Sequence, residues 1–251
     1  MAKSVAKVAV VICSNRKPRA NPQIANFVLE AIESTYQDRW SLEPSFKVID
    51  LAERNLPFFD EPDVPSQIHD YTKYAHAHTR EWSQEVQSYD AFIFVCPQYN
   101  WGYPAVLKNA IDYLYNEWKG KPAMIVSYGG HGGGRAAGQL RQVLCGVHMI
   151  PTKKHVELAF PSRSVLLEAA YGKDLGLDGF NAKGTWASQR KEIGDVFAEM
   201  MDLLTSNKVG KALKSAAVTF GYAKEELRKK FKKGSTAGEA TGRGEARSDD
   251  E

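Results

Sequence analysis

Short runs of apolar residues alternate along the chain with segments in which apolar residues recur every three or four positions. The runs are rich in β-branched residues and predict strands, whereas the spaced pattern predicts helices that bury one face. The predicted strands are residues 7–13, 46–51, 91–96, 123–127 and 154–159. The predicted helices are residues 22–36, 105–115, 135–146 and 192–204, with one more that ends near residue 87.

This alternation predicts an α/β fold, because parallel strands need crossover connections and helices supply them. The run at 91–96 is apolar throughout, as expected for a strand that helices cover on both faces. Five such strands fit a flavodoxin-like three-layer sandwich with a parallel sheet of order 2-1-3-4-5. In that arrangement a ligand binds outside the carboxyl ends of the strands, near the reversal of strand order.

Two regions depart from the alternation. Residues 161–185 are rich in Gly, Asp and Lys and predict a long loop or insertion. After about residue 208 there is one possible helix, 222–231, crowded with charges, and then 234–251 without large apolar residues, which predicts disorder. We therefore expect a domain at 1–207 and a basic extension at 208–251. The possible helix in this extension could bind acidic lipid or a partner protein, or it could be solvated. The helix has few apolar residues, which favours solvation.

Composition narrows the class of protein. The 251 residues are 43% hydrophobic and 25% charged, as in ordinary soluble globular proteins, and the net charge of +3 does not predict a nucleic-acid partner. No apolar stretch approaches the roughly 18 residues that a membrane helix needs, and strand-like sequence begins too early for a signal peptide. The three cysteines are widely spaced and odd in number, which favours reduced thiols and a cytoplasmic protein.

The loop after the third predicted strand, residues 97–104, reads Pro-Gln-Tyr-Asn-Trp-Gly-Tyr-Pro. Three aromatic side chains, an amide pair and a glycine at a strand end indicate a flat aromatic ligand with polar edges, and a flavin is the leading candidate. For Trp101 and Tyr103, packing against a second subunit is an open alternative. The candidate ligand contacts are Pro97, Gln98, Tyr99, Asn100 and Trp101.

The loop after the first predicted strand suits a phosphate. Asn21 is expected to cap the following helix and Pro22 to occupy its first position, so that unpaired N–H groups and the helix dipole favour an anion. Ser14 and Asn21 would add neutral donors, and Arg16 a guanidinium that matches phosphate oxygens. A solvated basic turn is the alternative. The position of this loop directly after the first predicted strand favours the interpretation as a phosphate site.

A glycine-rich loop follows the fourth predicted strand. Its glycines let the backbone approach a ligand and present N–H groups, which suits the polar edge of a flavin ring; a flexible connector is the alternative. It lacks the Walker motif, and no dinucleotide fingerprint follows the first strand. No metal site is expected, because His76 and His78 have no further ligand at suitable spacing. The candidate contacts here are Ser127, Tyr128, Gly129, Gly130 and His131.

Together the three motifs resemble the NAD(P)H-dependent FMN reductase family of the flavodoxin-like superfamily, and most closely its fungal quinone reductase branch. The resemblance covers about residues 5–205 and rests on residues 14–16, 97–112 and 121–133. It implies FMN with its phosphate at Ser14, Arg16 and the following turn. The isoalloxazine ring would lie against 98–101 and 127–131. The family usually has glycine at the place that Cys13 occupies here.

The resemblance also implies ping-pong turnover, in which NADPH or NADH reduces FMN and leaves before a quinone, a free flavin or an azo compound is reduced. The cofactor carries this chemistry, so we predict no catalytic side chain. A homodimer or tetramer with FMN near the subunit contacts is implied as well. The alternative is a non-enzymatic flavin-binding electron carrier or redox sensor, which the mild basicity and the arginine in the phosphate loop disfavour.

Overall fold

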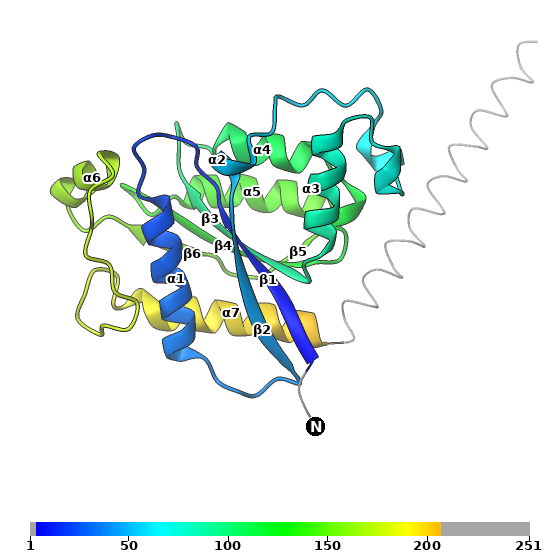
Figure 1. Ribbon diagram of the computed structural model, residues 1–251. Helices are drawn as coiled ribbons and strands as arrows, with labels where there is room; N and C mark the ends of the chain where they lie inside the picture. Colours follow the sequence, from blue (N-terminus) through cyan, green and yellow to red (C-terminus); the bar gives the residue numbers. More distant parts are fainter. Residues whose placement is uncertain (1–3, 207–251) are drawn as a thin grey trace, which may run out of the picture. The chain divides into compact units, whose positions relative to one another are not determined.

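The computed structural model describes residues 4–206 and shows a parallel sheet between two layers of helices (Figure 1). The strands are β1 (Ser4–Ile12), β2 (Leu42–Asp50), β3 (Ala91–Pro97), β4 (Pro122–Gly129), β5 (Ile150–Pro151) and β6 (Val156–Ala159). The order β2-β1-β3-β4-β5 confirms the predicted fold. The fifth position is divided, because β5 pairs with the start of β4 and β6 with its end.

The helices are α1 (Asn21–Thr35), α2 (Leu51–Arg54), α3 (Ala77–Gln87), α4 (Ala105–Asp112), α5 (Gly134–Gly146), α6 (Arg163–Ala170) and α7 (Gln189–Thr205). They agree with the predicted pattern except that the short helix α2 and helix α6 were not predicted. Helix α6 lies in the region predicted as a long loop. Ser162 caps it, since its hydroxyl accepts a hydrogen bond from the Val165 backbone N–H at 3.3 Å. The extension predicted at 208–251 lies outside the described residues.

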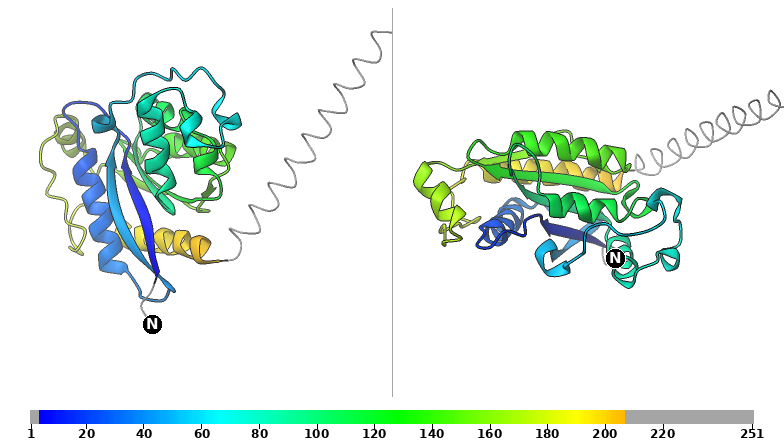
Figure 2. Two further views of the ribbon diagram at one scale, coloured as in Figure 1. Left: turned by 45° about the vertical axis from the view of Figure 1, so that its right-hand side comes forward. Right: turned by 90° about the horizontal axis from the view of Figure 1, so that it is seen from above.

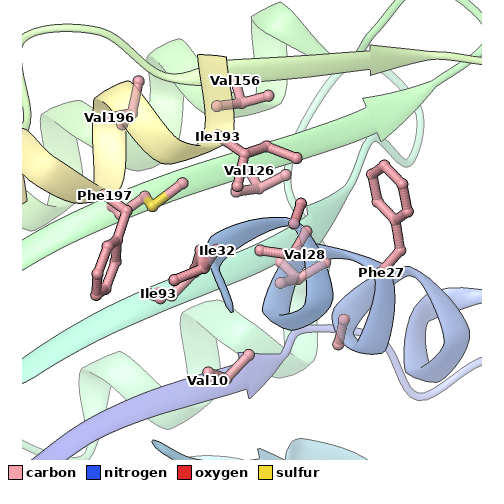
Figure 3. Close-up of a cluster of buried hydrophobic side chains, with 14 of the residues drawn as sticks. Val10, Phe27, Val28, Ile32, Ile93, Val126, Val156, Ile193, Val196 and Phe197 are labelled. Atoms are coloured by element: carbon pink, nitrogen blue, oxygen red, sulfur yellow. The ribbon is translucent and has the colours of Figure 1, made fainter. Parts of the chain in front are cut away.

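Helices cover both faces of the sheet (Figure 2). Helices α1 and α7 pack on one face, where the side chains in Figure 3 form one apolar cluster; α3, α4 and α5 pack on the other. Successive side chains of β3 alternate between the clusters, with Ile93 in the first and Phe92 and Phe94 in the second. This explains why the β3 sequence is apolar throughout. Each such buried side chain contributes about 1.5–3 kcal/mol.

The register of the central strands brings their carboxyl ends to one edge of the sheet. Ile12 of β1 lies opposite Val95 of β3, and Cys96 of β3 lies opposite Ser127 of β4. The loops that follow these three strands therefore start side by side although they are far apart in sequence. Among residues 4–206, no helix is long and apolar enough to cross a membrane.

A lysine is held in the apolar layer near the start of β4. The ammonium group of Lys121 donates to the Val86 carbonyl at 2.6 Å and lies 5.6 Å from the centre of the Phe92 ring. Burial disfavours the charged form and lowers the pKa of Lys121 to about 8.

We predict that Lys121→Met stabilises the protein at pH 7 and that this advantage shrinks as pH rises. The unfolded chain keeps the lysine proton up to about 10.5, whereas the folded protein releases it near 8, so stability increases with pH between these values. Relative to the variant, the natural protein should gain about 2 kcal/mol between pH 7 and pH 9.5. Urea unfolding at both pH values measures this. If the difference in free energy of unfolding between the variant and the natural protein were the same at both pH values, the lowered pKa of Lys121 would be contradicted.

Candidate functional site

A pocket of about 430 Å³ lies where the loops after β1, β3 and β4 meet. Its volume falls in the range of small-molecule sites. The sequence predicted that these three loops share one site, and all three do line this pocket. The predicted residues that line it are Arg16, Pro97, Gln98, Tyr99, Asn100, Tyr128, Gly129 and Gly130. Their role in binding a cofactor stays a prediction.

The other predicted residues are absent from the pocket lining, and two of them were predicted in the Gly-rich loop. Ser127 is buried, with its hydroxyl oxygen 2.9 Å from the Gly132 carbonyl oxygen and 3.3 Å from that of Val156. It therefore holds the Gly-rich loop against β6. His131 is exposed at the turn of the same loop. The predicted residues outside the lining are Ser14, Asn21, Trp101, Ser127 and His131.

The expected capping role of Asn21 is wrong. Ala20 is the N-cap of α1 and makes no side-chain cap, while Asn21 begins the helix. Its amide nitrogen instead donates to the Val95 carbonyl at 3.1 Å and so ties the helix start to β3. Among the described residues, Asn21 Oδ1 and the Ser14 hydroxyl are buried without a hydrogen-bond partner. The atom that Asn21 leaves free is thus an acceptor, not the donor that the sequence predicted.

Two arginines line the phosphate-loop side of the pocket, and only one has a counter-ion in the part of the chain that the structure describes. Arg19, which sequence reasoning missed, forms a two-pronged hydrogen bond with Asp50 at the end of β2 and also donates to the Ser14 carbonyl. The hydrogen bond to Asp50 raises the pKa of Arg19. Arg16 forms no ion pair among residues 4–206. Its charge is therefore available to an anion.

The loop after β3 is a tight turn. Tyr99 and Gly102 exchange backbone hydrogen bonds of 2.8 and 3.0 Å, and the residues between them, Asn100 and Trp101, have φ of +47° and +70°. Asparagine adopts this left-handed conformation readily, but tryptophan rarely does. The Trp101 side chain is 60% exposed, with the Arg135 guanidinium 4.7 Å from its ring centre. Tyr103 is partly buried against the second cluster.

Gln98 fixes the loop after β3 to its neighbours. Its backbone N–H donates to the Tyr128 carbonyl at 3.0 Å, and its side-chain oxygen accepts from the Ala136 N–H at 3.3 Å. The second bond satisfies one of the unpaired N–H groups in the first turn of α5. Gln98 thereby fixes the spacing between two walls of the pocket.

The Gly-rich loop requires glycine where it turns back toward β4. Gly132 and Gly133 have φ of +81° and +83°. A Cβ on Gly133 would lie 3.0 Å from Ser127 Cβ and from the Tyr128 backbone nitrogen. Tyr128 itself is buried edge-on against Phe160, and burial raises the pKa of its phenol, which therefore stays neutral.

Cys13, at the place where the resembling family usually has glycine, packs into the core. It is fully buried in the second cluster with Cys96, and its thiol donates to the Val11 carbonyl at 3.3 Å. Burial raises the pKa of the Cys13 thiol, which remains protonated.

Sequence reasoning missed one whole wall of the pocket, formed by Phe160, directly after β6, and by α6. A signal was present, because Val165, Leu166 and Ala169 follow a capping serine at helical spacing. The residues of this wall are Phe160, Leu166, Ala169 and Ala170.

The chain is similar to known NAD(P)H-dependent reductases. A family model described as NADPH-dependent FMN reductase matches residues 6–161. An NAD(P)H-dependent FMN reductase of Saccharomyces cerevisiae is 46% identical over 145 residues, 57% of this chain and 75% of that protein. A quinone reductase of Pseudomonas putida is 32% identical over 147 residues, 56% of this chain and 70% of that protein.

A solved structure supports the fold. The flavoenzyme NAD(P)H:acceptor oxidoreductase of Paracoccus denitrificans superimposes with a TM-score of 0.53 at 21% identity, and the match covers 79% of this chain and 97% of that one.

We predict that Gly133→Ala lowers the free energy of unfolding by about 1–3 kcal/mol, because the new Cβ meets β4 and the left-handed φ is strained. Gly138→Ala is the matched control. A Cβ on Gly138 meets no atom within 4 Å, and alanine stabilises a helix interior by about 0.5–1 kcal/mol. Urea unfolding compares the two variants. Equal effects would show that the Gly-rich loop does not depend on its glycine.

Proposed function

The chain belongs to the NADPH-dependent FMN reductase family, and from that premise we propose that its pocket binds FMN for an NAD(P)H-dependent FMN or quinone reductase. When bound, FMN supplies the redox chemistry by accepting a hydride from NAD(P)H and passing the electrons to an acceptor. The protein binds, orients and shields this group. Quinone-type small molecules are the acceptors that the relatives indicate.

The loop after β1 would hold the phosphate and the ribityl chain. The observation that carries this proposal is Arg16, a cation in the loop after β1 that has no counter-ion among residues 4–206. Within the same residues the Ser14 hydroxyl of that loop and Asn21 Oδ1 at the start of α1 lack hydrogen-bond partners. Buried polar atoms are almost always hydrogen-bonded, so these two fit a ligand group. The guanidinium and the Ser14 hydroxyl are donors suited to phosphate oxygens. Asn21 Oδ1 is an acceptor suited to a ribityl hydroxyl.

The isoalloxazine ring would lie between the loops after β3 and β4. Gln98, Tyr99 and Asn100 supply one wall, and Gly129 and Gly130 supply the other. Backbone N–H groups of the Gly-rich loop would stabilise the negative charge that the ring gains on reduction. The proposed reaction needs no side-chain nucleophile, because the protein acts by binding and electrostatics.

We further propose a homodimer or tetramer in a reducing compartment such as the cytoplasm. Large apolar side chains are exposed, with Phe58 87% exposed and Trp101, in the loop after β3, 60% exposed, and such exposure suits a subunit contact. The three cysteines, Cys13, Cys96 and Cys145, are free thiols, in keeping with that compartment.

Steady-state oxidation of NADPH by the FMN-loaded protein, with and without a benzoquinone, tests the function. We expect quinone-dependent oxidation and parallel-line kinetics typical of a ping-pong route. FMN binding without any quinone-dependent turnover would favour an electron carrier instead.

We predict that Arg16→Ala raises the FMN dissociation constant about 10- to 100-fold, because the phosphate loses a charge-assisted hydrogen-bond partner. Arg141→Ala is the control with the same loss of charge, since Arg141 bonds to the Lys153 carbonyl outside the pocket lining. Quenching of flavin fluorescence during titration of the apoprotein gives both constants. Equal constants for the two variants would remove Arg16 from the phosphate site.

A further inference from the structure

Helix α6 lies between two of the three loops that the proposed function assigns to the cofactor, the loop after β4 and the loop after β1. In the middle of the helix, Leu166 Cδ1 lies 3.0 Å from the position that a Cβ on Gly130 would take. Just beyond the carboxyl end of the helix, a Cβ on Gly172 would lie 2.7 Å from Pro18 Cβ and 3.2 Å from the Arg19 nitrogen. Figures 1 and 2 show α6 beside the loop from β1 to α1.

The segment that carries α6 is anchored along α1. The Gln23 side chain donates to the Lys173 carbonyl at 2.8 Å and accepts from the Leu175 N–H at 2.9 Å. The Glu30 carboxylate accepts from the Gly179 N–H at 2.8 Å. These bonds join residues about 150 positions apart, so α6 is held in place as part of the domain.

Trp186 anchors the end of this segment to the strand β6 and to α1. Its indole N–H donates to the Ala159 carbonyl at 2.6 Å, and its ring packs 5.7 Å from that of Phe27 and 5.5 Å from that of Phe160. Phe160 lines the pocket. The anchor of the segment and the wall of the pocket are therefore in direct contact.

The inner face of α6 is apolar. Leu166, Ala169 and Ala170 line the pocket that Arg16 lines from the phosphate-loop side, whereas Leu167 is 45% exposed and absent from the lining. An apolar wall beside a cation excludes water, which strengthens the attraction between that cation and an anion. It also removes apolar ligand surface from solvent.

We propose that α6 is a further wall of the FMN site and that it retains the cofactor, with Leu166 as its main contact. This inference rests on the proposed function. The helix lies beyond residues 6–161, which the family model matches, so the wall is an addition to the part of the chain that the family model describes.

Titration of the apoprotein with FMN tests the proposal on a matched pair, Leu166→Ala and Leu167→Ala. The two changes remove the same atoms from neighbouring positions of one helix. We expect Leu166→Ala to raise the dissociation constant about fivefold to tenfold, mainly through faster dissociation. Leu167→Ala should stay within about twofold of the natural protein. Thermal unfolding of each apoprotein checks that it is folded.

A second pair keeps the proposal testable if Leu166→Ala fails to fold. Ala170→Glu places a carboxylate at the pocket wall and should weaken FMN binding more than Leu167→Glu does. Identical FMN affinity within both pairs would overturn the α6 wall, as would tighter binding by Leu166→Ala. Failure of the natural protein to bind FMN would instead overturn the proposed function, so the two failures are distinguishable.

Discussion

Parallel pairing of β3 with β1 on one side and β4 on the other is the constraint on which the site depends. The register ends these strands at one edge, with Ile12 opposite Val95 and Cys96 opposite Ser127. Three loops separated by many residues therefore meet around one pocket. The pairing is stabilised because β3 is buried on both faces, so the same apolar side chains that form the core also position the loops.

The polar groups around the pocket divide into those that hold the walls and those that remain for a ligand. Arg19 is committed to Asp50, and Gln98 joins the loop after β3 to the first turn of α5. With these walls fixed, Arg16, Ser14 and Asn21 keep unused bonding capacity within the described part of the chain. Such preorganisation favours binding, because less order is lost when the ligand arrives.

Sequence predicted what depends on local pattern, and missed what depends on contacts across the fold. The strands other than the two-residue β5, most helices and the three pocket loops follow from hydrophobic period and position. The Asn21 cap was wrong because the bond to Val95 spans 74 positions. The role of Arg19 was not predicted, because its partner, Asp50, lies at the end of another strand and is distant in sequence. Helix α6 was not predicted, because the Gly, Asp and Lys residues of the segment around it are typical of a loop.

The most direct measurement of the central claim is a crystal structure of the protein with FMN. We expect phosphate oxygens within about 3 Å of the Ser14 hydroxyl and the Arg16 guanidinium, a ribityl hydroxyl at Asn21 Oδ1, and the ring between residues 98–100 and 129–130. FMN bound elsewhere, with Ser14 and Asn21 still lacking partners, would contradict this claim.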